Sequence, residues 1–377
     1  MSEYQYYEFQ AIDRSLTPEE QQVVAQLSSR VEPHPRRAVF TYSFGGGLRR
    51  RAEDLLAEYY DAMLYLANWG SRQLMFRFPK TLVDLQQVQQ YATEFWSDLV
   101  NAISVHIEGE YAILDIQLHE EEGLGWIEGE GWLDSLIELR DAILRRDYRV
   151  LYLAWLKGIT LEYRENDDAF EPPVPPGLRT LTPALERFVE LFDVDEDLIQ
   201  VAAERSSELG GEISDDDLRW AIGQLSTEER DAFLLRLAKG EPHLSLALNR
   251  RLGTFGGASQ GETAKRRTVG DLFAATEALR ERRHRERVAM AEARRIAELK
   301  ALAEREDEAW REVDALIQQS QAKAYDEAVR LLKRLEGLAE HQNRRSAFEG
   351  HLGQIHDRYS RRRALIRRLR EAGLIHQ

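Results

Sequence analysis

The side chains best suited to chemistry lie in a glycine-rich stretch that follows an expected strand. His119 and the run Glu120 to Glu122 are followed by Glu128 and Glu130, with two tryptophans nearby. Carboxylates and an imidazole are ligands that a divalent cation accepts. Acidic side chains in a glycine-rich loop are more often simply solvated. We therefore favour a loop that is held in place by its two tryptophan side chains and binds no metal. A metal-dependent enzyme site at Glu120 to Glu130 remains the weaker alternative.

A second candidate is a glycine loop between an expected strand and an expected helix. Glycines let backbone N–H groups converge, and the positive start of a helix together with arginines attracts an anion. The spacing matches neither GxxxxGK[ST] nor GxGxxG, so it is no nucleotide fingerprint. The alternative interpretation is a plain connecting loop with no role in binding an anion. The residues of this candidate anion loop are Gly45, Gly46, Gly47, Arg49 and Arg50.

Nucleophilic and thiol chemistry have little support. The chain has no cysteine, which excludes disulfides, zinc ribbons, iron–sulfur clusters and thiol nucleophiles. No GxSxG or HExxH motif occurs, and His106, His119 and His243 have no recognisable partner spacing. A nuclease reading of Asp115 is weakened because the lysine expected two residues after the acid is absent. We therefore expect no catalytic residues, no metal ligands and no cofactor.

Arginines gather in the C-terminal third of the chain. At helical spacing, Arg363, Arg367 and Arg370 share one face. Such residues can pair with acidic groups of this chain or of a protein partner, which we favour, or they can grip nucleic-acid phosphate. The candidate partner- or phosphate-binding residues are Arg282, Arg283, Arg285, Arg287, Arg363, Arg367 and Arg370.

The overall charge of −15 conceals two different halves. Residues 261–377 carry 26 Lys+Arg and 20 Asp+Glu, a net of +6, which leaves −21 for residues 1–260. A chain-wide nucleic-acid surface is therefore excluded, since phosphate binding needs clustered cations. The N-terminus lacks the basic start and apolar run of a signal peptide, and the apolar runs are too short to span a bilayer. We expect no membrane contact and a cytoplasmic location.

Patterns along the chain predict an α+β N-terminal domain, an all-α middle domain and an extended helical tail. A hairpin is predicted from Ile103 to Leu118 around Glu108-Gly109-Glu110, whereas long helices are predicted over Ala52 to Trp69, Leu82 to Val100 and Asp134 to Ile159. Four prolines in five positions after Glu171 indicate a linker or a belt. The predicted divisions are 1–165, a linker at 166–180, a helical domain at 181–252, a glycine-rich joint at 253–267 and a helical tail at 268–377.

The tail itself should be helical throughout. Arg280 to Arg287 are all charged or histidine, so that part of a helix has no apolar face and is solvent-exposed. A helix from Thr268 to Ile317 would reach about 75 Å, which predicts a projecting arm. Tyr325 to Ala339 and Arg344 to Tyr359 then form a predicted helical hairpin, like a single tetratricopeptide-like unit.

Several motifs carry a resemblance. The opening Tyr4 to Arg14, Leu64 to Gly70, Glu128 to Trp132 and Glu171 to Gly177 together resemble a family of uncharacterised bacterial proteins, which carries no assigned activity to transfer. Separately, Tyr325 through Leu374 is similar to the C-terminal end of some bacterial SWIM zinc-finger proteins, but the zinc-binding Cys/His motif is missing here.

The favoured function is therefore a non-enzymatic interaction protein. The acidic aromatic domain would dock one protein partner, and the helical tail would present a second surface. The alternative is a nucleic-acid-associated protein that uses the tail arginines. The sequence leaves the oligomeric state open.

Overall fold

The computed structural model describes residues 4–29, 31, 33–43, 46–92, 102–120, 128–161, 167–209, 214–241, 243–253 and 266–375. The chain divides into two compact units, Met1–Leu279 and Arg280–Gln377, which we call unit 1 and unit 2. Unit 2 carries 23 Lys+Arg against 17 Asp+Glu, a net of +6, so unit 1 carries −21. The charge division predicted at residue 260 therefore persists when it is counted at the unit boundary.

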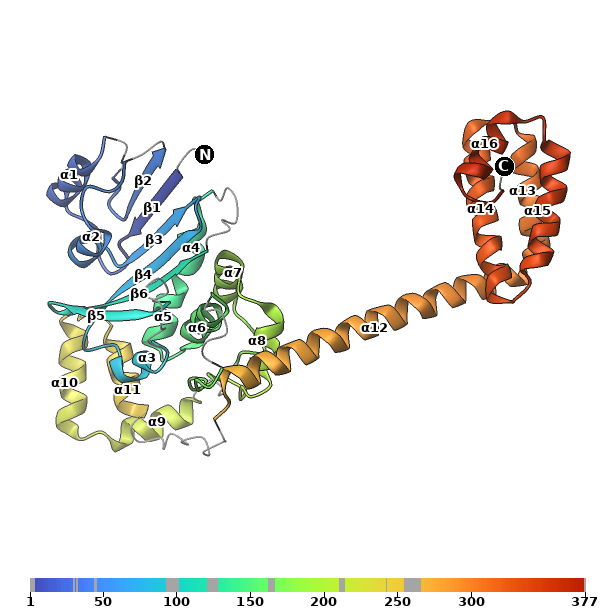
Figure 1. The fold of residues 1–377 in the computed structure, drawn as a ribbon. Coiled ribbons are helices and arrows are strands. Elements are labelled where there is room, and N and C mark those ends of the chain that lie inside the picture. Colours follow the sequence, from blue (N-terminus) through green and yellow to red (C-terminus); the bar gives the residue numbers. More distant parts are fainter. Residues whose placement is uncertain are drawn as a thin grey trace. The chain divides into compact units, whose positions relative to one another are not determined.

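Unit 1 is built on a six-stranded antiparallel sheet with the strand order β2-β1-β3-β4-β6-β5 (Figure 1). The predicted hairpin is confirmed as β5 and β6, with Gly109 in the turn at φ +59°, a conformation that favours glycine. The strands are β1 (Tyr4–Gln10), β2 (Arg37–Ser43), β3 (Ala62–Ala67), β4 (Ser71–Pro79), β5 (Ser104–Glu108) and β6 (Tyr111–His119).

Helices cover both faces of this sheet. One face packs Phe9, Phe40 and Met75 against α1 and α2, and the other packs Leu64 and Phe76 against the helices from α4 onward. In Figure 1 the two groups of helices lie on opposite sides of the strands. The helices within unit 1 are α1 (Pro18–Leu27), α2 (Ala52–Tyr59), α3 (Leu85–Gln89), α4 (Trp132–Leu136), α5 (Glu138–Leu144), α6 (Arg149–Leu161), α7 (Pro183–Phe192), α8 (Glu196–Ala203), α9 (Asp215–Gln224), α10 (Thr227–Ala238) and α11 (Leu244–Gly253).

The predicted helix over Ala52 to Trp69 is wrong in its second half. The structure ends α2 at Tyr59 and places β3 at Ala62–Ala67 in the centre of the sheet. A central strand buried on both faces reads as a continuous apolar run, which periodicity cannot distinguish from a helix. Asp61 marks the change, because its carboxylate accepts hydrogen bonds from the backbone N–H groups of Ile12 and Asp13.

The predicted helix from Asp134 to Ile159 is also corrected, since three helices occupy it. Arg146 adopts φ +67°, and the Asp147 carboxylate accepts from the backbone N–H of Arg149 at 3.1 Å, which starts α6 afresh. Of the helix predicted over Leu82 to Val100, the structure contains α3, while residues 93–101 lie outside the described part.

The proline-rich segment lies over the core of unit 1. Ser206 donates to the carbonyl of Pro175 at 2.7 Å, and Tyr91 donates to the carbonyl of Pro173 at 3.0 Å. Side chains from both sides of this segment belong to one hydrophobic core that includes Leu64, Trp155 and Phe188. This differs from the separate domains placed at 1–165 and 181–252, because α6, α7 and α8 share that core with the sheet.

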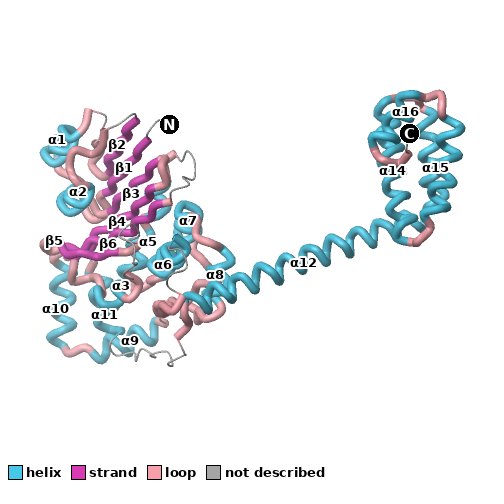
Figure 2. The backbone as a smooth tube through the Cα atoms, viewed as in Figure 1, coloured by secondary structure: helices cyan, strands magenta, loops and turns pink. Residues whose placement is uncertain are grey.

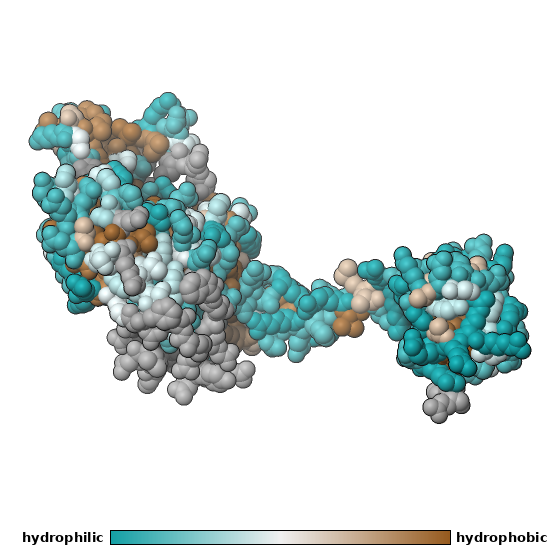
Figure 3. Space-filling model, turned by 90° about the horizontal axis from the view of Figure 1, so that it is seen from above, coloured by the Kyte–Doolittle hydropathy of each residue, from teal (hydrophilic) through white to brown (hydrophobic). Residues whose placement is uncertain are grey.

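Unit 2 is helical (Figure 2). The helix α12 (Val269–Glu304) begins in unit 1 and continues into unit 2, where α13 (Glu306–Gln318), α14 (Ala322–His341), α15 (Arg345–Tyr359) and α16 (Arg363–Glu371) follow. The predicted hairpin corresponds to α14 and α15. The helices from the end of α12 to α16 share an apolar core that includes Leu332, Leu352 and Leu369, and the face seen in Figure 3 is mainly hydrophilic.

Together these elements confirm an α+β part followed by a mostly helical remainder with long C-terminal helices. Within the described ranges, no helix combines the length and the apolar character needed to cross a membrane.

Candidate functional site

Two of the arginines that follow the glycine loop are paired with glutamates of α2. Arg50 forms an ion pair with Glu58, with a second contact at 3.1 Å, and Arg51 lies 3.5 Å from Glu53. Gly46 adopts φ +101°, and its carbonyl accepts from the Gln5 side chain at 3.0 Å. Arg49 and Gly47 belong to the same turn, with Arg49 exposed, whereas Gly45 lies outside the described residues.

The acidic stretch from Glu120 to Glu130 is described only at its ends. Glu120 forms an ion pair with the buried Lys157, whose ammonium also donates to the carbonyl of Asp193 at 3.0 Å. Glu128 and Glu130 are exposed, and residues 121–127 lie outside the described part. Among the described residues, no group of three or more His, Asp or Glu side chains is placed to hold a metal ion.

The arginines of α12 are exposed and interact along their own helix. Arg285 pairs with Glu281 at 3.0 Å, and Arg282 lies 4.0 Å from Glu286. Arg283 also makes an interaction, and Arg287 is exposed. The i,i+4 pairs explain how this polar stretch remains helical without an apolar face.

The C-terminal arginines divide between structural and exposed positions. Arg362 donates to the carbonyl of Ile317 at the end of α13, and Arg368 forms an ion pair with Asp326 at 2.5 Å. Arg363, Arg367 and Arg370 are exposed on α16, where the predicted helical spacing places them on one face, and Arg367 lies 3.6 Å from Glu371. Their role as a binding face stays a prediction.

Buried charges in unit 1 are mostly compensated by a partner of opposite charge. Glu8 accepts from Arg37 at 2.7 Å, and Asp61 accepts from Arg77 at 2.7 Å. Arg140 donates to both carboxylate oxygens of Asp13, at 2.9 and 2.7 Å. Burial raises the pKa of Asp13, but the hydrogen bonds and the positive charge of Arg140, together with His243, outweigh burial and lower that pKa. These pairs position elements and leave few buried groups available for proton transfer.

Asp115 is an exception. It lies on β6, and its two carboxylate oxygens accept from the Gln73 amide at 3.0 and 2.9 Å. Burial raises the pKa of Asp115 to about 7; the Gln73 hydrogen bond opposes the shift and the negative charge of Glu53 adds to it. Asp115 is not among the residues that line the hollows around α7 and α8.

A groove lies over α7 and α8 on unit 1. Thr182 caps α7, with Pro183 in the first turn, and Asp195 caps α8 by accepting from the backbone N–H groups of Asp197 and Leu198. Between them Asp193 adopts φ +49° in the three-residue connection that joins the two helices. Both helices pack against α6.

The groove consists of two adjoining hollows that share Leu181, Glu196 and Ile199. Their volumes are about 460 and 720 Å³, within the range of ligand-binding clefts. The apolar lining residues are Leu178, Leu181, Val189, Val194, Ile199 and Ala203. The acidic lining residues, which we call the acidic rim, are Glu186, Glu190, Asp193, Asp195, Glu196 and Glu204.

The acidic rim has little compensation from lining cations. Arg179 is the one basic residue among the side chains that line the two hollows, and it donates to the carbonyl of Ala203 at 3.2 Å. Arg187 contacts Glu190 and stacks over Trp132 with its guanidinium 3.9 Å from the ring centre. An apolar floor with an acidic rim suits an apolar side chain flanked by lysine or arginine.

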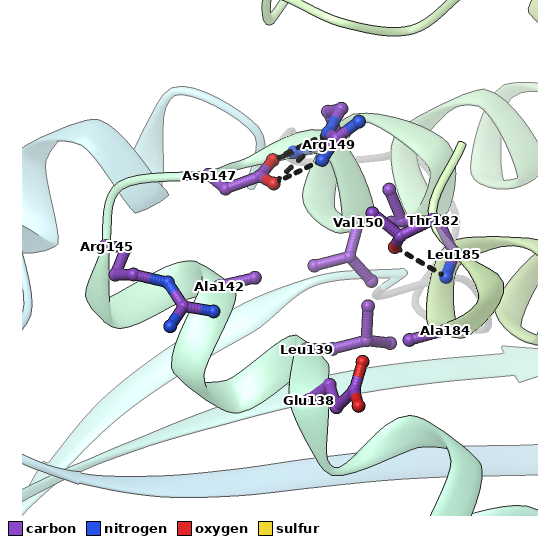
Figure 4. A pocket seen from close by; sticks show the side chains of 10 residues that line it. All are labelled: Glu138, Leu139, Ala142, Arg145, Asp147, Arg149, Val150, Thr182, Ala184 and Leu185. Carbon is purple, nitrogen blue, oxygen red and sulfur yellow. Dashed lines mark hydrogen bonds and ion pairs between the residues drawn. The ribbon is translucent and has the colours of Figure 1, made fainter. Parts of the chain in front are cut away.

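A smaller hollow lies on the other side of α7 (Figure 4). Leu139, Val150 and Ala184 form its apolar part, and Asp147 holds Arg149 through contacts of 2.7 to 3.1 Å. Arg149 also donates to the carbonyl of Thr180 at 2.9 Å, so its donors are occupied. At about 180 Å³ this hollow is below the size of ordinary ligand pockets.

The groove is absent from the sequence-based candidates. Its signal was present as the run Glu190 to Asp197, in which acids alternate with Leu191, Phe192 and Val194. That run lies within the helical domain predicted at 181–252. Recognising a groove required knowing that Leu178 and Leu181, from the segment after the prolines, lie beside Ile199.

Comparisons of this chain with models of known families, with curated proteins and with solved structures find no significant match.

Proposed function

We propose that this protein is a non-enzymatic interaction protein whose acidic unit 1 docks a basic segment of a partner protein in the groove over α7 and α8. The observation that carries the proposal is the combination of an apolar floor with six acids and one arginine around it. A basic amphipathic segment would place its apolar side chains on the floor and its cations along the acidic rim.

The helical unit 2 supports the second half of an adaptor role. It has its own apolar core and a net charge of opposite sign to unit 1. A chain with two separately cored units of opposite charge can engage two different surfaces. The exposed α16 arginines Arg363, Arg367 and Arg370 would form part of the second surface.

The nucleic-acid alternative has weaker support. Arg282 and Arg285 face glutamates one turn away, and Arg368 is engaged by Asp326. These acids lie where phosphates would have to approach, so they oppose phosphate binding. An enzyme at Glu120 has still less support, because Lys157 occupies its carboxylate.

The docking proposal is tested with a labelled twelve-residue peptide of alternating lysine and leucine pairs as the probe. Fluorescence anisotropy on the full chain should show binding that weakens as salt rises from about 50 to about 200 mM. A triple variant, Glu186→Gln, Glu190→Gln and Glu196→Gln, should weaken binding at least tenfold, since it neutralises half of the acidic rim.

A matched control removes the same charge elsewhere. Glu19→Gln, Glu108→Gln and Asp215→Asn neutralise three exposed acids outside the groove. This control should change the dissociation constant less than threefold. Equal losses in the two triple variants would mean that the peptide senses only the net charge of unit 1, and the groove would be rejected as the docking site.

A further inference from the structure

The C-terminal end of α7 is held by two buried cations from other elements. Arg72 of β4 donates to the carbonyl of Leu191. The Lys157 ammonium of α6 donates to the carbonyl of Asp193 at 3.0 Å. Arg72 and Lys157 are 6% and 5% exposed, and neither lines the groove. The last carbonyls of a helix lack partners within it and carry partial negative charge, so these cations stabilise the corner at which the chain leaves α7.

Lys157 lies between two carboxylates that differ in exposure. Its ammonium forms an ion pair with Glu120, which follows β6, and lies 3.8 Å from a carboxylate oxygen of Asp193. The Glu120 side chain is 21% exposed, whereas the Asp193 side chain is 66% exposed and lines the groove. Burial lowers the pKa of Arg72, and the negative charges of Glu120 and Asp193 oppose this shift. Glu120 is thus the closer partner of Lys157, and the Asp193 carboxylate remains exposed at the groove.

The turn between β3 and β4 holds Glu120 in place. The backbone N–H of Glu120 donates to the carbonyl of Gly70 at 3.2 Å. Gly70 adopts φ +94°, and a Cβ atom there would lie 1.9 Å from the carbonyl oxygen of Glu120, so only glycine permits this approach. Contacts of the sheet therefore place Glu120 beside Lys157.

We infer that Glu120 is a positioning residue of the groove, which keeps the Asp193 carboxylate available to a cation of the partner by holding the charge of Lys157. This inference deepens the proposed docking function and rests on it. Without the negative charge of Glu120, the Lys157 ammonium would be attracted to Asp193 and would neutralise one of the six acids of the acidic rim. Glu120 would thus set the charge of the groove through Lys157, without contacting the partner.

Two variants separate the charge of Glu120 from its packing. Glu120→Gln keeps the shape of the side chain and removes its charge, whereas Glu120→Asp keeps the charge and shortens the side chain. In the anisotropy assay with the lysine and leucine peptide, Glu120→Gln should raise the dissociation constant about threefold, the effect of one exposed ion pair. Glu120→Asp should stay within about 1.5-fold of the parent. The reverse order would show a packing role and would overturn the inference.

Glu108→Gln is the matched control for the loss of one negative charge. Glu108 is exposed, lines neither hollow of the groove and lies beside the turn of the β5–β6 hairpin, at the opposite end of β6 from Glu120. This variant should change the dissociation constant less than about 1.5-fold, because solvent and salt screen a distant exposed charge. A loss equal to that of Glu120→Gln would mean that the peptide responds only to net charge, and the inference would be rejected.

A thermal cycle without peptide reads the contact of Lys157 itself. Tryptophan fluorescence reports the melting of unit 1, which contains six of the seven tryptophans. In the parent chain, Asp193→Asn should shift the melting temperature by less than about 1 °C, because Lys157 is paired with Glu120 and Asn tolerates the left-handed conformation of residue 193. In Glu120→Gln, the same substitution should lower it by at least about 2 °C, because it removes the second carboxylate beside a buried ammonium. Equal shifts in both backgrounds would show that Lys157 does not turn to Asp193.

The two readouts separate this inference from the docking proposal. A parent chain that does not bind the peptide would reject docking in the groove, whereas the thermal cycle would still decide whether Glu120 holds the charge of Lys157. A thermal cycle with the expected difference, together with unchanged peptide binding in Glu120→Gln, would show that the partner does not use Asp193. That outcome would overturn the inference and leave the docking proposal standing.

Discussion

Four carboxylates of unit 1, which are buried to different degrees, differ in whether a cation accompanies them. Asp61 and Glu8 are fully buried beside arginines, and Asp13 is held by Arg140 through two hydrogen bonds. Asp115 faces an uncharged amide instead. A carboxylate that is paired with an arginine depends on that cation, whereas burial without a cation raises the pKa of Asp115. Removal of a partner and removal of the carboxylate itself are therefore different tests for the two kinds of site.

Arg140→Met should destabilise unit 1 strongly. The side chain of Arg140 is 1% exposed, and its removal leaves the Asp13 carboxylate and the backbone carbonyl of Arg77 without their donors. Because the Asp13 carboxylate is partly exposed and also lies 3.2 Å from His243, we expect a loss of about 2–3 kcal/mol, below that of a fully buried pair. Urea denaturation followed by tryptophan fluorescence measures this loss, because six of the seven tryptophans lie in unit 1.

The exposed pair of Arg14 with Glu20 provides the comparison, at 2.7 Å. Arg14→Met should cost no more than about 1 kcal/mol. Similar losses in the two variants would show that the Arg140 network contributes no more than a surface pair.

Asp115→Asn should change how stability depends on pH. With its pKa at about 7, folded Asp115 keeps its proton where an unfolded aspartate, with a pKa near 3.9, has lost it. The folded state thus binds more protons between these values, so this group's contribution is complete below about pH 4 and is lost as pH rises through about 7. The variant should gain on the order of 2–4 kcal/mol relative to the parent between pH 4 and pH 8.

Thermal unfolding at pH 4, 6 and 8 tests this dependence. Asp231→Asn, at an exposed position, should give a curve parallel to the parent. If Asp115→Asn is also parallel to the parent, Asp115 is ionised throughout and its raised pKa is refuted.

At the scale of elements, the start of α12 is attached to unit 1 by several kinds of contact. Arg267 donates to both carboxylate oxygens of Glu171, at 2.9 and 2.5 Å, and Tyr152 donates to the same carboxylate. The backbone N–H of Val269 donates to the carbonyl of Ala169 at 2.8 Å. Leu272 and Leu279 then enter the main core.

Glu171→Gln should loosen this attachment selectively. The variant leaves Arg267 buried without its counter-charge, so the Val269 and Gly270 amides should exchange hydrogen at least tenfold faster. Amides of β4 should be unchanged. Arg266→Met is the control, because Arg266 lies over the exposed Phe170 ring and makes no part of the Glu171 pair. Unchanged exchange at Val269 in Glu171→Gln would contradict the anchoring role.

The elements that could be predicted from the sequence are those that depend on residues close together in the chain. The glycine turn identified the β5–β6 hairpin, and helical spacing identified α14 and α15. The strand β3 was missed because its apolar run has no period of its own. The anchor between Glu171 and Arg267 could not be predicted, since 96 residues separate the partners. The groove was missed for the same reason: its walls come from different segments.

For the whole molecule, the core residues indicate where the chain can be divided. Unit 1 and unit 2 have separate apolar cores, whereas the proline-rich segment lies inside the core of unit 1. The positions of the prolines and the distribution of charge therefore predicted different boundaries. The two compact units carry net charges of opposite sign, as do the two parts of the chain divided at residue 260. Prolines indicate where a helix or strand ends, whereas a shared hydrophobic core determines which segments fold as one unit.

Residues 1–279 and 280–377 should each fold when produced alone. Their circular dichroism spectra should sum to that of the full chain, and each should melt cooperatively. Chains cut at the predicted linker, 1–180 and 181–377, are the comparison; this cut separates Trp155 from Phe188 within one core, so the N-terminal piece should not melt cooperatively. Cooperative melting of the 1–180 chain would show that α7 and α8 are dispensable to the sheet.

The attachment of α12 also has a mechanical meaning. Any tension on the chain from unit 2 must enter unit 1 through residues 267–279, because no other covalent path leads there. Under such tension we expect Leu279 to leave the core first, then Leu272 and Val269, and the pair of Arg267 with Glu171 to be loaded after them. The start of α12 would then detach turn by turn before any element earlier in the chain is loaded.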